Sequence, residues 1–256
     1  MTLLQSTSEA FPNGLANRSD QVGRNLMDHI SGAGASGLLH GFEDKTVFGR
    51  RPGGIYIPRY ANITENDKPY RRGFGYQGGG TPVGGPSGRT PGIGRAFKEA
   101  RRRPGPWRVS IGAFGEQLPD PENRVTLHPT RRDKWGNPIA VFRVKYSENA
   151  YIMMEEARTD AIAMLEAAGC TDIRSSPVEL TKPGNRIHEM GSARMGRDPA
   201  TSVLNGWCQA HDVGNLFITD GSFMASAACQ NPSLTYMAFS ARAANYAADL
   251  MAEGRL

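Results

Sequence analysis

Two segments in the last third of the chain gather residues whose types and spacing could do chemistry. Residues 186–196 (RIHEMGSARMG) carry His188, and a neutral imidazole titrates near neutral pH, where it can take up or release a proton. Residues 215–235 contain an Asp-Gly pair after a short apolar run, and then an Asn-Pro pair before a helical pattern. A strand-ending turn and a helix N-cap followed by proline would explain this second segment without any function.

Two motif matches do not meet the physical requirements of the sites they suggest. His188 and Glu189 begin an HExxH pattern, but Ser192 stands where the second histidine would be, so we expect no metal there. Residues 32–37 (GAGASG) match GxGxxG. A dinucleotide site also needs an apolar strand before the glycines and a carboxylate about 20 residues later. The sequence has neither, so it predicts no nucleotide-binding loop here.

The region after Trp107 predicts the regular elements that would position such residues. Apolar residues alternate with small or polar ones over 109–113, 125–127 and 139–146, which is typical of an antiparallel sheet. Residues 149–168 then change to a helical period, with Gly169 as the stop. The expected apolar face of this helix is Met153, Met154, Ala157, Ala161, Met164, Leu165 and Ala168.

The last quarter predicts one strand and one helix. Leu216–Thr219 reads as a short apolar strand that ends at Asp220 and Gly221. A long helix begins near Pro232, with Asn231 as a candidate N-cap. A helix N-terminus also presents free N–H groups and positive potential, which suit an anionic ligand. The expected close-packing face of this helix consists of Ala238, Ala241, Ala244 and Ala248.

Residues 41–106 show no sustained periodicity. The stretch Gly73–Gly94 is rich in glycine and proline, which favours loops and turns over regular elements. We therefore expect this region to be a flexible linker or a loop that covers a substrate.

Composition places the chain among globular proteins. Of its 256 residues, 39% are hydrophobic and 21% charged, which allows a real core. The net charge of +5 gathers at Arg101–Arg103 and Arg131–Arg132 without interleaved aromatic residues, so nucleic-acid binding is not expected. Three cysteines without CxxC spacing argue against a disulfide scaffold or a zinc site.

No signal peptide or apolar run of roughly 18 residues is visible, so we expect a cytoplasmic or complex-associated protein.

The two C-terminal segments together resemble the glucose–methanol–choline (GMC) family of FAD-dependent oxidoreductases, and most closely its gluconate and sugar dehydrogenase branch. Residues 11–17 (FPNGLAN) and 22–29 (VGRNLMDH) are similar to the family region that follows its first Rossmann units. The resemblance covers nearly the whole chain and is thinnest between about 41 and 106. It implies the C-terminal half of such an enzyme.

The resemblance implies an α/β (α+β) fold in three parts. Residues 1–40 would be an FAD-domain or lid segment, and residues 41–185 the substrate domain, loop-rich at 41–106 and built from an antiparallel sheet backed by helices at 107–185. Residues 186–256 would carry the catalytic motif with the C-terminal strand and helix of the FAD-binding domain. The glycine fingerprint that anchors the cofactor in the family has no counterpart in the sequence, so this Rossmann-like domain is expected to be incomplete.

The resemblance also implies roles for individual residues. His188 matches the base that removes the hydroxyl proton, and Asn231 matches the second active-site position, which would hold the substrate oxygen. Asp220 and Gly221 match a position near the ribityl and pyrophosphate groups of FAD, and the backbone at Asn231 and Pro232 would face the flavin ring. The expected partners are FAD, a small alcohol or sugar substrate and, as a candidate, a separate electron-accepting subunit. No metal is expected.

The function implied is oxidation of a CH–OH group, of a sugar or polyol, by His-assisted hydride transfer to flavin. Two alternatives stay open: a non-catalytic remnant or subunit that docks onto a flavoprotein, and a lyase on the same scaffold. Because the anchoring unit is not in the sequence, we expect the isolated chain to bind little FAD and to be inactive.

Overall fold

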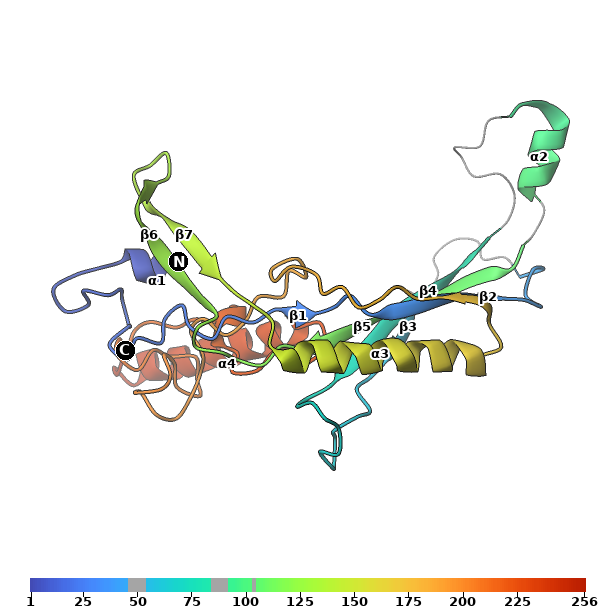
Figure 1. Cartoon of the computed structure of the whole chain (residues 1–256). Coiled ribbons are helices and arrows are strands. Elements are labelled where there is room, and N and C mark those ends of the chain that lie inside the picture. Colours follow the sequence, from blue (N-terminus) through green and yellow to red (C-terminus); the bar gives the residue numbers. More distant parts are fainter. Residues whose placement is uncertain (46–53, 84–91, 103–104) are drawn as a thin grey trace. The chain divides into compact units, whose positions relative to one another are not determined.

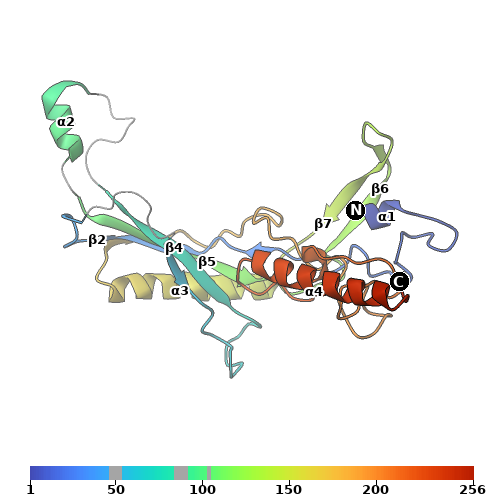
Figure 2. The same ribbon diagram turned by 180° about the vertical axis from the view of Figure 1, so that it is seen from behind.

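The computed structural model describes residues 1–45, 54–83, 92–102 and 105–256 (Figures 1 and 2). The helices are α1 (Thr2–Gln5), α2 (Gly94–Arg102), α3 (Glu148–Ala167) and α4 (Ser233–Ala252), with a 3-10 turn at Gly221–Phe223. The strands are β1 (His29–Ile30), β2 (Gly34–Leu39), β3 (Ile55–Ile57), β4 (Phe74–Pro82), β5 (Trp107–Glu116), β6 (Arg124–Arg132), β7 (Pro138–Arg143) and β8 (Thr171–Arg174).

The chain forms two compact units, each built from segments that are distant in sequence. The first unit contains residues 1–30, 116–148 and 182–256, and the second contains residues 31–115 and 149–181. The segment 116–148, which the sequence groups with a central substrate domain, lies in the first unit.

The second unit is an antiparallel sheet with the strand order β3-β4-β5-β2-β8 (Figure 1). Helix α3 covers this sheet, and the hydroxyl of Tyr76 on β4 donates to the carbonyl of Ala157 at 2.7 Å. Gly115 makes room for the helix, since a Cβ there would lie 2.6 Å from the methyl carbons of Met153 and Met154. The expected antiparallel sheet backed by a helix is therefore confirmed.

Strand β4 corrects the expectation of loops and turns across Gly73–Gly94. Nine residues, Phe74–Pro82, pair in continuous register with β5. Glycine lets the backbones of β4 and β5 approach closely here, because a Cβ at Gly78 would lie only 2.1 Å from the carbonyl oxygen of Ser110. Residues 84–91 of the expected loop lie outside the described residues.

The GxGxxG match at residues 32–37 lies in the same sheet. Residues from Gly34 onward form β2, which pairs antiparallel with β5 and with β8. The match does not open a helix, in agreement with the prediction that it is not a nucleotide-binding loop.

The alternating runs after Trp107 form strands, but not one sheet. The first run is β5 in the second unit, whereas β6 and β7 form a separate antiparallel hairpin in the first unit (Figure 1). Val125 on β6 lies opposite Phe142 on β7. Alternation predicts a strand and its faces but not its neighbour, which explains the difference.

Helix α3 follows its expected bounds within one residue, and the residues it buries are Ala150, Met153, Met154, Ala157, Ala161 and Leu165. Helix α4 also forms as expected. The alanines of its predicted close-packing face, Ala238, Ala241, Ala244 and Ala248, are exposed within this chain. The opposite face packs instead, with Ala243 and Leu250 buried and Tyr236 and Phe239 against the core, because larger side chains remove more apolar area from water.

The predicted strand at Leu216–Thr219 is wrong. Its residues make only an isolated bridge between Phe217 and Gln209. Within the described residues no named strand lies beside it, and an apolar run without a partner strand does not form a ladder. The run packs against the core of the first unit, which is centred on Val203, Leu204 and Phe223.

Among the described helices, none combines the length and the apolar character that crossing a bilayer requires.

Candidate active site

Three segments of the first unit are joined by backbone hydrogen bonds around His188. Met27 and Met190 each donate their N–H to the other's carbonyl, at 2.8 and 2.9 Å. On the other side, the N–H of Ala193 donates to the carbonyl of Ser222 at 2.9 Å. The segment that follows His188 therefore lies between the segment around Met27 and the 3-10 turn at 221–223.

Gly191 allows the first of these approaches. Its φ is +95°, and a Cβ would lie 2.1 Å from the carbonyl oxygen of Asn25. A side chain at this position would meet backbone, which cannot move aside cheaply. The spacing of His188 from the segment around Met27 thus depends on glycine here.

Asp28 binds the loop that carries His188. Its carboxylate accepts backbone N–H bonds from Gly184 at 2.9 Å, from Arg186 at 3.0 Å and from His188 at 3.2 Å. It also accepts the N–H of His29 at 2.7 Å. Asp28 is only 2% exposed, and hydrogen bonds to an ionised acceptor are among the strong ones in proteins. One buried carboxylate therefore fixes the backbone of two histidines.

The imidazoles of His29 and His188 are hydrogen-bonded to each other. Their Nδ1 atoms lie 2.9 Å apart, and the rings meet edge to face with centroids 4.8 Å apart. Nε2 of His29 lies 3.4 Å from the carbonyl oxygen of Ala227. Burial lowers the pKa of His29 below its usual value, and the neighbouring charge of His188 lowers this pKa further. The carbonyls of Ala227 and Ala228 and the charge of Asp28 oppose this shift, but the net direction favours the neutral form of His29.

Asn231 faces the other side of His188. Its Nδ2 lies 3.5 Å from Nε2 of His188, at the outer limit of a hydrogen bond. Helix α4 begins at Ser233 with Pro232 at the cap position, and no side-chain hydrogen bond caps it. The N-cap position is thus taken by Pro232 and not by Asn231, whose amide lies beside the imidazole.

Asp220 and Gly221 lie at the 3-10 turn. The carboxylate of Asp220 accepts the N–H of Ser222 at 2.9 Å, so its side chain caps this turn. Gly221 is buried, and a Cβ there would lie 2.5 Å from both the carbonyl oxygen of Glu189 and the hydroxyl of Tyr236. A turn-forming role accounts for Asp220 in this structure, and a cofactor-binding role is left to the proposal below.

Tyr236, one turn into α4, carries a buried polar atom without a partner. Its hydroxyl makes no hydrogen bond to any described residue. Burial raises the pKa of Tyr236, and the negative charges of Glu189, Asp220 and Asp28 raise it further. Buried hydroxyls are normally paired, so this one is an exception among the described residues.

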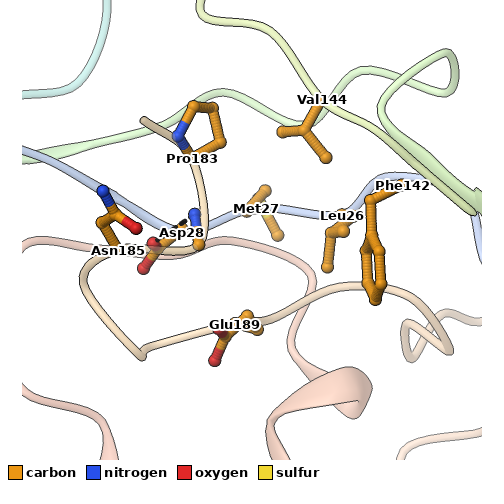
Figure 3. A pocket seen from close by; sticks show the side chains of 9 residues that line it. Leu26, Met27, Asp28, Phe142, Val144, Pro183, Asn185 and Glu189 are labelled. Carbon is orange, nitrogen blue, oxygen red and sulfur yellow. Dashed lines mark hydrogen bonds between the residues drawn. The ribbon is translucent and has the colours of Figure 1, made fainter. Parts of the chain in front are cut away.

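A pocket of about 390 Å³ adjoins the loop 183–189 (Figure 3). Leu26, Phe142 and Val144 form its apolar end, away from Asp28 and Asn185. The full lining is Leu26, Met27, Asp28, Phe142, Val144, Pro183, Gly184, Asn185 and Glu189. Neither His188 nor Asn231 lines it, so the pocket is beside the histidine pair and is not the same site.

The structure thus brings His188 and Asn231 together and places Asp220, Gly221 and Pro232 on the two segments next to them. The family-like segment 22–29 contains Asp28 and His29, for which the sequence predicts only a structural or cofactor-covering role. Sequence reasoning did not single out Tyr236. Among the described residues there is no group of three or more His, Cys, Asp or Glu side chains arranged to hold a metal.

Comparison with known proteins gives the context of this geometry. Residues 119–240 match the family model described as GMC oxidoreductase, which covers the C-terminal domain. The chain is 31% identical to the 2-methyl-1,2-propanediol dehydrogenase of Mycolicibacterium austroafricanum over 254 residues, which are 95% of this chain and 45% of that protein. It is also 31% identical to the fructose dehydrogenase large subunit of Gluconobacter japonicus over 256 residues, covering 95% and 44% of the two chains.

Solved structures agree on the fold. The formate oxidase of Aspergillus oryzae superposes with a TM-score of 0.54 at 15% identity, over 89% of this chain and 47% of that one. The chain therefore spans about half the length of the proteins it matches.

Proposed function

Because this chain belongs to the GMC oxidoreductase family through its C-terminal domain, we propose that it supplies the alcohol-oxidising residues of an FAD-dependent enzyme that acts on CH–OH groups of sugars or polyols. One observation carries the proposal: Nε2 of His188 and the amide of Asn231 meet at 3.5 Å although they are 43 residues apart in sequence. The names of the relatives, a diol dehydrogenase and a fructose dehydrogenase, support the substrate class.

The two side chains have complementary tasks in such a reaction. The substrate hydroxyl gives its proton to Nε2 of His188, and the amide N–H of Asn231 holds the oxygen as negative charge develops on it. FAD, when bound, would accept the hydride that leaves the same carbon, so that a carbonyl product results. An imidazole suits this step because its ordinary pKa is close to neutral pH.

The residues that would hold FAD lie at the start of α4 and at the turn before it. We assign Asp220 and Gly221 at the 3-10 turn, and Asn231 with Pro232 at the helix start, to cofactor binding. The unpaired hydroxyl of Tyr236 and the uncapped N-terminus of α4 support a polar, electron-rich ligand at this place.

The chain matches only about half of its relatives, so we propose that it acts together with a unit that anchors the dinucleotide, on the same or another polypeptide. Helix α4 supports this, because its outward face includes Leu234 at 77% and Met237 at 68% exposure next to the exposed alanines. The match to a protein named a large subunit supports a separate electron-accepting subunit, and hence a complex-associated location.

Flavin reduction in the flavin-loaded full protein tests the proposal. Replacement His188→Ala is expected to slow anaerobic flavin reduction by sugar or polyol by roughly 10²–10⁴-fold, with little loss of bound flavin. The exposed His40 of the second unit provides the matched control, and His40→Ala should leave the rate unchanged. An equal loss of flavin in His188→Ala would indicate a structural role, and a wild-type protein that binds flavin but never bleaches would favour a lyase or a non-catalytic subunit.

A further inference from the structure

The ring nitrogens of His29 and His188 belong to one row of hydrogen-bonding atoms. It includes the carbonyl oxygen of Ala227, 3.4 Å from Nε2 of His29, and the contact between the two Nδ1 atoms, at 2.9 Å. The amide nitrogen of Asn231 lies 3.5 Å from Nε2 of His188 on the other side. All of these atoms belong to the first unit.

The protons on this row can be assigned from its buried end. A carbonyl oxygen can only accept, so Nε2 of His29 carries a proton. His29 is 1% exposed, and burial disfavours a second proton on the ring, so its Nδ1 is a bare acceptor. The short contact at 2.9 Å then requires Nδ1 of His188 to be the donor. A neutral His188 with a proton on Nδ1 has a bare Nε2, which faces the N–H donor of Asn231.

The opposite arrangement fails on electrostatic grounds. It would place the bare Nε2 of His29 against the carbonyl of Ala227, so that two lone pairs would face each other at 3.4 Å in a buried environment. It would also place a proton on Nε2 of His188, against the amide nitrogen of Asn231.

We infer that His29 is a positioning residue, which holds His188 in the tautomer with Nδ1 protonated and Nε2 free to accept a proton. Only this tautomer of a neutral His188 can act as a base on the Asn231 side. The use of the free nitrogen in alcohol oxidation rests on the proposed function, whereas the tautomer itself does not.

Asp28 makes the arrangement rigid. The same carboxylate oxygen, Oδ1, accepts the backbone N–H of His29 at 2.7 Å and that of His188 at 3.2 Å. The two rings are therefore attached to backbones that share one acceptor, which limits how far they can separate. After proton uptake at Nε2, His188 keeps its Nδ1–H bond to His29, so the pair does not rearrange during the step.

Nitrogen-15 NMR of the full chain with labelled histidine reads the tautomers directly, because protonated and bare ring nitrogens resonate in separate regions. The protein has five histidines, and the variant spectra assign them. We expect His188 with a protonated Nδ1 and a bare Nε2, and His29 with the reverse. A protonated Nε2 on neutral His188 in the wild-type spectrum would overturn the inference.

Two variants separate positioning from simple packing. In His29→Asn the amide oxygen can replace Nδ1 as acceptor, so His188 should keep its tautomer. In His29→Leu no acceptor is left, and a substantial fraction of His188 should change to the form protonated on Nε2. An unchanged His188 tautomer in His29→Leu would contradict the inference, and His40→Leu serves as the control.

The flavin-loaded enzyme gives a second, independent result. His29→Leu should lower kcat for flavin reduction at least tenfold with little change in KM, and His29→Asn should restore most of it. If NMR finds the expected tautomer but the wild-type enzyme oxidises no CH–OH substrate, the proposed function fails and the inference stands. The reverse result would reject His29 as the positioning residue and keep the proposed function.

Discussion

The two units differ in how their buried phenol hydroxyls are paired. In the second unit the phenols under α3 are satisfied: Tyr70 donates to Glu156 at 3.1 Å, and Tyr76 to the carbonyl of Ala157 at 2.7 Å. In the first unit the phenol of Tyr236 has no partner among the described residues, and the imidazole pair ends at an exposed amide, Asn231. The second unit uses its polar groups to fix a sheet to a helix, whereas the first unit leaves the phenol of Tyr236 unpaired within the described residues and places Asn231 at the surface.

The backbone shows the same contrast. The sheet of the second unit runs in regular antiparallel register across β4 and β5. Around the site of the first unit, Ile187 and Ala228 both have positive φ, at +53° and +55°, although neither is glycine. Such conformations are costly for a β-branched residue and are often found at functional sites. The backbone of the site therefore depends on hydrogen bonds to side chains, and the Asp28 carboxylate accepts four of them.

Replacing the Asp28 carboxylate should cause the largest loss of stability. Asp28→Asn replaces an acceptor of four N–H groups by an amide that presents its own N–H to them. We expect the first unit to lose about 2–4 kcal/mol of stability, measured by urea unfolding. Asp44→Asn, at an exposed position, is the control and should be neutral. A loss below about 0.5 kcal/mol in Asp28→Asn would show that the loop 184–188 is held by other contacts.

Removing one of the hydrogen-bonded phenols of the second unit should cause the next largest loss of stability. Tyr76→Phe removes a buried hydrogen bond between β4 and α3 and should destabilise the second unit by about 1–2 kcal/mol in the same unfolding assay. If the variant is as stable as the wild type, the distinction drawn between the two units is weakened.

The buried His29 of the first unit should make the stability of the chain depend on pH. Its pKa is lowered in the folded state, mainly by burial, so the unfolded chain binds more protons below the ordinary pKa of about 6.5. Stability should therefore fall as pH decreases from about 6.5, by at most about 1.4 kcal/mol per pH unit from this residue. His29→Asn should remove that part of the slope, measured as unfolding midpoints between neutral and mildly acidic pH.

The smallest expected change in stability is a gain and not a loss. Tyr236→Phe removes a buried hydroxyl that has no partner, so the flavin-free chain should gain up to about 1 kcal/mol. The same variant should bind flavin more weakly in the complete protein, measured by flavin fluorescence. A loss of stability without flavin would show that the hydroxyl has a partner in solution.

Long periodic segments were predictable from the sequence. Helices α3 and α4 follow their expected ranges closely, because each carries enough residues for its period to show. The alternating runs located β5, β6 and β7, but β5 and β6 extend beyond the expected residues. Strand β4 was missed because its glycines are there for contact with β5 and carry no apolar pattern. The face of α4 that packs within this chain was not predicted, because alanine spacing marks only a possible contact, whereas larger aromatic side chains decided which face is buried here.

The site was predictable only in part. The resemblance singled out His188 and Asn231, and the structure has their side chains near each other. The hydrogen bonds of Asp28 could not be read from the sequence, because all four donors to its carboxylate are backbone N–H groups, whose direction depends on the loop conformation. The proton arrangement of His29 and His188 likewise depends on a carbonyl, that of Ala227, which no residue type reveals.

The bonds of Asp28 to the loop join positions 156 to 160 residues apart, and this separation has a consequence for folding. Closing a chain segment of that length costs about 4–5 kcal/mol in configurational entropy. Local helices and the β6–β7 hairpin can form before that cost is met, but the histidine pair cannot. We therefore expect the pair to assemble late, at or after the rate-limiting step, so that partly folded chains do not contain it.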